Sequence, residues 1–336
     1  MAHDANNEQV MFEALSATGA RSVKQVGAAH WRLAFSNGVS FSAAAVAGED
    51  WLVMDVQPSA ASKRLPPPAR LWDLLEWNGG LRGGAKFALA PGDLAPSVRA
   101  ELPLEDGGCP AEALQLAGVG LKQAVGRLHG KKEAGEPAPR PAAGEAAGRK
   151  TGEKEAAAGE ECDLEALCAA AGWKFSRRGS GRLAVELEAP DCTSQAIVEQ
   201  RGTGLAVTVE LLSSEALGAT ARQAAALMLL TACGLVRMVR GTATLAGGGR
   251  TVLGYEVTLE ASPTEGQLGR GLSALSVACR LCGQGEVEAV QDESVAQRYL
   301  AARGWEGLAS GEMAPAGGPA STPSTEGNPQ QERNAK

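Results

Sequence analysis

The chain has 336 residues, a formal net charge of -7 at pH 7, 44% hydrophobic residues and 21% charged residues. This length exceeds the usual size of one domain and predicts two domains, each with its own core. The mild acidic excess argues against a protein whose main task is to bind nucleic acid.

Targeting and redox signals are weak. The N-terminal residues have no basic region followed by an apolar run and a cleavage site, and the longest apolar run, residues 224–230, is too short to span a bilayer. We therefore expect a cytoplasmic protein without membrane segments. The seven cysteines are an odd number, scattered over a long chain. They favour free thiols in a reducing compartment over a disulfide framework.

The first half predicts a helix, three strands, a second helix, a two-stranded hairpin and a closing helix. Prolines before the second helix favour its first turn. The expected ranges are helix 9–17, strands 27–35, 39–46 and 51–56, helix 69–77, hairpin 83–105 and helix 110–128.

The hairpin has the sequence GGAKFALAPGDLAPSVRAELPLE, residues 83–105. A short apolar run enters a Pro-Gly-Asp turn, and apolar residues from Val98 to Leu104 then alternate with polar ones. This pattern predicts a pair of strands that builds a sheet and not an active site.

Composition changes abruptly after His129. Residues 130–161 contain no aromatic residue and no Leu, Ile or Val, but many Pro, Gly and charged residues. Such a segment cannot bury enough surface to fold, so we expect a flexible linker there and a disordered tail at residues 307–336.

The second half repeats the order of the first. The expected ranges are helix 163–171, strands 182–188, 196–200 and 205–211, helix 217–235, hairpin 236–259, helix 268–281 and an additional helix 287–302. The economical interpretation is an α+β protein with two tandem domains, residues 1–129 and 162–306. Each domain is expected to contain a helix, a three-stranded antiparallel meander, a helix, a two-strand hairpin and a helix.

This element order and residues 74–105 together resemble the bacterial type III secretion chaperone-like superfamily, including YbjN-like proteins. The residues that carry the resemblance are Leu74, Leu75, Asn78, Phe87, Ala88, Leu89, Arg99, Ala100, Leu102, Pro103 and Leu104. The second half departs from the pattern, because its hairpin lacks the LPL ending. The resemblance implies a small non-enzymatic module that dimerises and holds a partner polypeptide on its sheet and helix surfaces.

Catalytic signals are sparse. The only three histidines are His3, His30 and His129, and none lies near the residues that a triad or metal site needs. We interpret His30 as a strand residue at the sheet surface. The chain lacks the common nucleotide, nucleophile-elbow and zinc-protease motifs. We therefore predict no enzyme activity and no cofactor.

One motif leaves an alternative open. Cys279 and Cys282 form a CxxC, which serves in other proteins as a redox couple or as half of a zinc site. No second close pair of cysteines completes a zinc ribbon, and this CxxC ends a helix instead of beginning one. Structural packing is the favoured interpretation, and a small-molecule or thiol-redox enzyme is the alternative.

The helix at 217–235 is apolar nearly all round between Ala224 and Cys233. A helix on one sheet keeps a polar stripe, so we expect this helix to be buried on two sides, covering its own sheet and meeting another copy of the domain. The other reading is an alanine-rich surface helix. In the family it resembles, the helix at this position is the dimer element. The predicted pairing residues are Leu227, Met228 and Leu230.

The leading hypothesis is an adaptor or chaperone-like protein that captures a protein or peptide partner. Its domains are expected to pair through their middle helices, either as domain 1 with domain 2 or in a homodimer. A partner segment is expected to lie in an apolar groove or along a sheet edge. Tryptophan is a frequent interface anchor, so the predicted partner-binding residues are Trp31, Trp51, Trp72 and Trp77. We expect no nucleic-acid or membrane partner.

Overall fold

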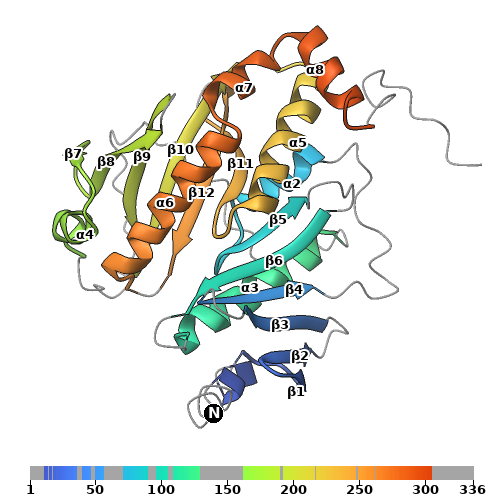
Figure 1. The fold of residues 1–336 in the computed structure, drawn as a ribbon, viewed down its shortest axis with the longest axis vertical. Coiled ribbons are helices and arrows are strands. Elements are labelled where there is room, and N and C mark those ends of the chain that lie inside the picture. Colours follow the sequence, from blue (N-terminus) through green and yellow to red (C-terminus); the bar gives the residue numbers. More distant parts are fainter. Residues whose placement is uncertain are drawn as a thin grey trace, which may run out of the picture.

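The computed structural model contains two six-stranded antiparallel sheets that lie side by side (Figure 1). It describes residues 11–13, 15–16, 18–35, 40–46, 50–56, 71–89, 96–104, 109–128, 162–189, 192–215, 217–246, 249–260 and 262–304. The predicted linker at 130–161 and the tail at 307–336 lie outside these residues. The mixed α+β class predicted from the sequence is confirmed.

The first half begins with helical residues 11–13 and 15–16. The elements that follow are β1 (Ser22–Gly27), β2 (His30–Ala34), β3 (Ser40–Val46), β4 (Trp51–Val56), α2 (Leu71–Asn78), β5 (Ala85–Leu89), β6 (Pro96–Pro103) and α3 (Ala111–Leu128). The strands pair in the order β1-β2-β3-β4-β6-β5. The hairpin predicted at 83–105 is therefore β5 and β6, which pair antiparallel.

The second half follows the same plan and adds two helices at its end. Its elements are α4 (Leu164–Ala170), β7 (Phe175–Arg177), β8 (Arg182–Ala189), β9 (Cys192–Arg201), β10 (Gly204–Ser214), α5 (Ala219–Leu235), β11 (Arg240–Leu245), β12 (Thr251–Leu259), α6 (Glu265–Leu281), α7 (Gln284–Ala289) and α8 (Glu293–Ala301). The order of its strands is β7-β8-β9-β10-β12-β11, the counterpart of the first sheet. The helix predicted at 287–302 is divided into α7 and α8.

The prediction of three strands before each middle helix was wrong, because the described residues of each half form four there. The missed strands are β1 and β7, at the outer edges of the two sheets. β1 is mostly exposed, so it lacks the alternation of apolar and polar residues that marks a half-buried strand. β7 has only three residues, too few to show a period.

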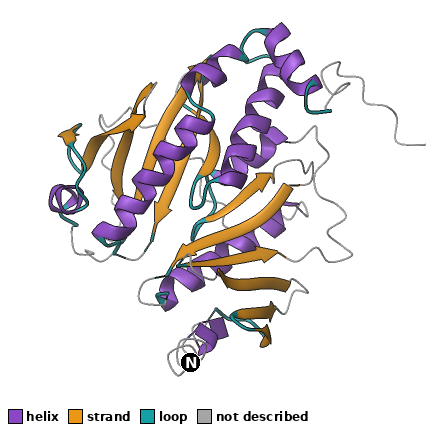
Figure 2. Ribbon diagram, in the orientation of Figure 1, coloured by secondary structure: helices purple, strands orange, loops and turns teal. Residues whose placement is uncertain are grey.

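Each sheet has a closing helix on one face. α3 packs against β5 and β6, whereas α6 packs against β8, β9, β10 and β12. In Figure 2, α6 lies in front of the second sheet and α3 lies behind the first. Side chains along the strands alternate between the covered and the open face of the sheet. In β4, Leu52 and Met54 are buried. Trp51, Val53 and Asp55 point to the opposite, open face.

The glycine-rich segment before β5 packs directly on α3. A Cβ atom on Gly120 would lie 2.0 Å from the carbonyl oxygen of Arg82, and one on Gly83 would lie 2.1 Å from the backbone of Leu116. Gly83 also has a φ of +60°, which favours glycine. Close backbone contact with α3 thus explains two of the glycines around this segment.

Candidate functional site

The two halves meet through their middle helices and inner edge strands. α5 packs against β5 and α2 packs against β11, so each middle helix contacts the edge strand of the opposite half. The two helices also contact each other. Because β5 and β11 hold the same position in their sheets, the packing is reciprocal. We call this contact region the junction.

A buried lysine on β5 binds the end of α5. The ammonium of Lys86 is fully buried and lies 2.6 Å from Glu101 on β6. It also donates to the carbonyl oxygens of Cys233 and Val236, at 2.7 and 2.8 Å. Carbonyls in the last turn of a helix lack partners within the helix and carry partial negative charge. Lys86 therefore caps a helix of the opposite half with a positive charge.

The carboxylate of Glu101 fixes the turn that follows α5. It accepts a hydrogen bond from the backbone N–H of Met238 at 2.9 Å. Met238 has a φ of +64°, a left-handed conformation that costs a residue with a side chain about 1–2 kcal/mol. The contact with Glu101 offsets part of this cost, so the Lys86–Glu101 pair holds both the helix end and the strained residue after it.

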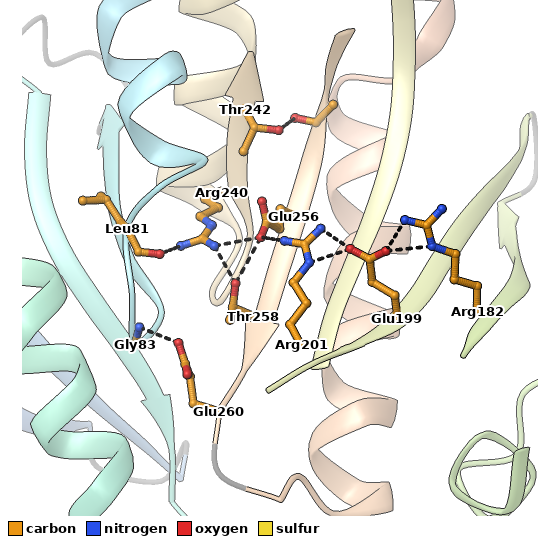
Figure 3. Close-up of polar contacts among 11 residues, drawn as sticks. Leu81, Gly83, Arg182, Glu199, Arg201, Arg240, Thr242, Glu256, Thr258 and Glu260 are labelled. Carbon is orange, nitrogen blue, oxygen red and sulfur yellow. Dashed lines mark hydrogen bonds and ion pairs between the residues drawn. The ribbon is translucent and has the colours of Figure 1, made fainter. Parts of the chain in front are cut away.

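An arginine occupies the corresponding place in the second half. Arg240 on β11 lies 2.9 Å from Glu256 on β12, and both side chains are almost completely buried. Its Nη1 donates to the carbonyl oxygen of Leu81, which follows α2, at 2.6 Å (Figure 3). Each half thus places a buried cation and glutamate beneath the segment that leaves the other half's middle helix.

The second pair continues into a row of charges on the open face of its sheet. Figure 3 shows this row running from Glu256 through Arg201 and Glu199 to Arg182. The exposed fraction of the arginine side chains rises along it, from 3% for Arg240 to 42% for Arg182. Exposed ion pairs contribute little to stability, so the inner end of the row matters most.

The side chain of Asn78, at the end of α2, forms hydrogen bonds with three backbone groups on strands β5 and β11. Its side chain accepts a hydrogen bond from the N–H of Phe87 at 2.7 Å and donates to the carbonyl of the same residue at 3.1 Å. It also donates to the carbonyl of Gly241 in the opposite half at 3.0 Å. The amide is fully buried, and both of its polar atoms are bonded.

The four predicted partner-binding tryptophans lie in different surroundings. Trp31 is only 1% exposed and belongs to the core of the first half, so its ring is not available to a partner. Burial alternates along β2, and Trp31 lies on its buried side. Trp77 is half-buried, with its ring 5.8 Å from that of Phe87.

Trp51 and Trp72 are half-buried, and each stacks with an arginine of the opposite half. The guanidinium of Arg237 lies 5.6 Å from the ring centroid of Trp51, and that of Arg222 lies 5.6 Å from that of Trp72. Such cation–π contacts stabilise by about 0.5–1 kcal/mol at exposed sites. Both tryptophans therefore take part in the junction.

The residues predicted for pairing lie on α5. Leu230 is fully buried, Leu227 is 4% exposed and Met228 is half-buried. α5 contacts β5 and α2 of the first half as well as its own β11, and α8 covers a further side. The sequence predicted a helix at residues 287–302 but gave no indication that this part of the chain packs on α5.

The CxxC residues are buried at the end of α6. Cys279 and Cys282 are each 5% exposed. Burial raises the pKa of the Cys282 thiol to about 12. A redox cysteine reacts as the thiolate, which such a pKa makes scarce at neutral pH. Among the described residues, no group of three or more His, Cys, Asp or Glu is placed to hold a metal ion.

An open groove of about 700 Å³ lies beside Trp51. Its lining comes from both halves: the start of β4, the end of α4 and one side of α6. We call it the Trp51 groove, and its lining residues are Asp50, Trp51, Ala170, Ala171, Glu265, Gly266, Gly269, Arg270 and Ser273. A second cavity, next to Glu101 and Met238, has only about 50 Å³, room for one or two water molecules.

Sequence reasoning missed the four charged residues of the junction. Lys86 is the single charge in the apolar strand AKFAL, and a lone charge in an otherwise buried strand signals a buried ion pair. No comparable signal marks Glu101, Arg240 or Glu256, which lie in strands with other polar residues.

The chain matches no family model, and comparisons with curated proteins and with solved structures found no match either. Among the helices that the structure describes, none is long and apolar enough to cross a membrane.

Proposed function

We propose that the protein is a non-enzymatic adaptor or chaperone-like protein that captures a segment of a partner polypeptide. The observation that carries this proposal is the Trp51 groove, an open concave surface with a half-buried tryptophan in its wall. Tryptophan anchors are common in protein interfaces. Trp51 is also one of the four residues expected from the sequence to bind a partner.

The lining of the groove favours a polypeptide over a small substrate. Ala170, Ala171, Gly266 and Gly269 have small or no side chains, which allows another backbone to approach closely. Small-molecule sites are usually enclosed pockets with a few convergent polar groups. An open groove with scattered charges instead suits an extended segment that is held along its length.

The charged groups of the junction support a structural role in place of catalysis. The three N–H donors of Lys86 are all taken, by Glu101 and two backbone carbonyls at the end of α5, and Glu101 also accepts from the N–H of Met238 in the turn after it. The reciprocal packing of α2 and α5 supports pairing of the two halves through their middle helices within one chain. In this proposal the junction is the scaffold that assembles the groove.

A display library of random peptides, selected on the full-length protein, tests the proposal. Fluorescence anisotropy then measures the affinity of selected peptides for two groove variants. We expect Trp51→Ala to weaken binding by tenfold or more, because it removes the anchor. Gly269→Trp should have a similar effect by filling the groove, since a Cβ at this position has no atom within 4 Å.

Gly285→Trp is the matched control. Gly285 lies on α7, outside the groove, and a Cβ there also has no neighbour within 4 Å. The control should bind selected peptides as the parent does. Equal affinity of all three variants for every selected peptide would refute the groove as the capture site.

A further inference from the structure

The junction is a self-complementary surface. Each half offers a middle helix and a buried cation–glutamate pair, and receives the same two features from the other half. Surfaces with this reciprocity are typical of contacts between two copies of one unit related by a twofold axis. Here both units belong to one chain.

The junction contacts that the structure describes come from the two halves themselves and lie outside residues 129–161. Most of the described hydrogen bonds across the junction join β5, β6 and the residues around α2 to α5, β11 and the turn between them. A further one joins the N–H of Gly83 to Glu260, which follows β12. The connection runs from the end of α3 at Leu128 to the start of α4 at Leu164. The same contacts therefore form whether the two halves come from one chain or from two.

We propose that the junction is exchangeable, so that the first half of one copy pairs with the second half of another copy and the reverse pair closes a dimer. All junction contacts of the monomer are kept in this dimer, and none is left open. Each Trp51 groove is then composite, with Trp51 from one copy and the α6 wall from the other. The proposal concerns the pairing of halves and stands whether or not the groove binds a peptide.

The length of the connection decides between the two forms. The composition of residues 130–161 predicts a flexible connection, which gives pairing within one chain an effective concentration on the order of 1 mM, so we expect the monomer to dominate at micromolar concentrations. A connection too short to reach removes this advantage. Exchange then becomes the only way to complete the junction.

The positions of α3 and α4 give the distance that the connection must cover. Arg127, beside the end of α3, donates to the carbonyl of Trp77 at the end of α2, and α2 packs on β11. α4 instead contacts β8 and β9. Three to four strand spacings of about 4.8 Å separate these places, so the chain must cross roughly 14–19 Å.

Deletion of residues 130–161 tests the proposal. It joins His129 to Cys162 and leaves three Cα–Cα steps from Leu128 to Asp163, which span at most about 11 Å. We expect light scattering during size-exclusion chromatography to give twice the mass of one chain. A deletion of residues 146–161 keeps enough chain to cross and should stay monomeric.

A charge reversal separates exchange from other association. Lys86→Glu in the full deletion places a second carboxylate beside Glu101 and should return the dimer to monomer mass. A folded monomer from the full deletion itself, or a dimer that tolerates Lys86→Glu, would overturn the proposal.

A second measurement decides the matter if the deletion chain does not fold. Two full-length chains with different affinity tags are unfolded together, refolded at about 1 mM and then diluted. We expect a mixed species that carries both tags and separates over hours, because the halves must part before they return to their own chains. Absence of any mixed species would overturn the proposal.

Discussion

The two halves place a buried cation at the same position of the same fold, but they satisfy it differently. Lys86 has three N–H donors, and Glu101 with two carbonyls of the α5 segment takes all three. Arg240 has five, and its Nε has no hydrogen-bond partner among the described residues. Every N–H donor of Lys86 therefore has an acceptor, whereas the Nε donor of Arg240 lacks one among the described residues.

The carboxylates differ as well. Glu256 is shared between Arg240 and Arg201, and Arg201 continues the row of charges toward solvent. Glu101 has Arg99 only at 3.7 Å, beyond its close contact with Lys86. Loss of the cation therefore leaves the carboxylate of the first half with only the more distant Arg99, but leaves that of the second half in a close pair with Arg201. Similar position in a fold does not imply similar contribution to stability.

Removal of each cation should give the largest effect and expose this difference. Lys86→Met removes the close cation of a buried carboxylate and leaves Glu101 with Arg99 at 3.7 Å and the N–H of Met238, so we expect a cost toward the ~3–5 kcal/mol of a broken buried ion pair, about 3 kcal/mol or more. Arg240→Met leaves Glu256 with Arg201, so we expect only the loss of charged hydrogen bonds, about 1.5–3 kcal/mol. Urea unfolding monitored by circular dichroism measures both free energies of unfolding.

A double variant provides the control. Glu101→Gln added to Lys86→Met removes the buried charge that has lost its close partner and should recover part of the lost stability. Equal losses of unfolding free energy for Lys86→Met and Arg240→Met would show that the second arginine beside Glu256 does not compensate for the loss of Arg240.

The next largest change in stability is expected from the close backbone contact between α3 and the segment before β5. Gly120→Ala places a Cβ against the carbonyl oxygen of Arg82, and overpacking of this kind typically costs about 1–3 kcal/mol. Gly269→Ala on α6 meets no atom within 4 Å, and alanine favours a helix by up to about 1 kcal/mol. The two substitutions should change the urea midpoint in opposite directions. A neutral Gly120→Ala would mean that the segment before β5 can move away from α3.

The order of the helices and of most strands was predictable because it depends on local patterns. The alternation in β6 and the apolar periodicity of α3 appear within one segment of sequence. The junction depends on residues distant in sequence: Lys86 and Cys233 are 147 positions apart. No local pattern tells which carbonyls a lysine will meet. The all-round apolar character of α5 indicated burial on two sides, but not which elements supply the cover.

The stacked arginines should give a smaller effect. Arg222→Met removes the cation over Trp72 while keeping an unbranched side chain, and we expect a loss of about 0.5–1 kcal/mol. Arg298→Met on α8 is a matched control, because its guanidinium is exposed and bonds the carbonyl of Ser294 in its own helix. Equal stability of the two variants would show that the ring contact adds nothing to the junction.

The smallest effect concerns pH and the open face of the first sheet. Burial raises the pKa of the Asp55 carboxyl above its ordinary value of 3.8, and Arg99, 3.5 Å away, opposes the shift. The folded protein therefore binds more protons than the unfolded chain just above pH 3.8, and this residue's contribution to stability falls as pH rises through that window. Asp55→Asn imitates the neutral carboxyl and lacks this dependence.

In urea unfolding between pH 4 and pH 7, we expect the variant to gain stability relative to the parent as pH rises. A relative loss instead would mean that the ion pair with Arg99 outweighs burial. The open face of the first sheet would then be held by charge, like the outer row of the second sheet.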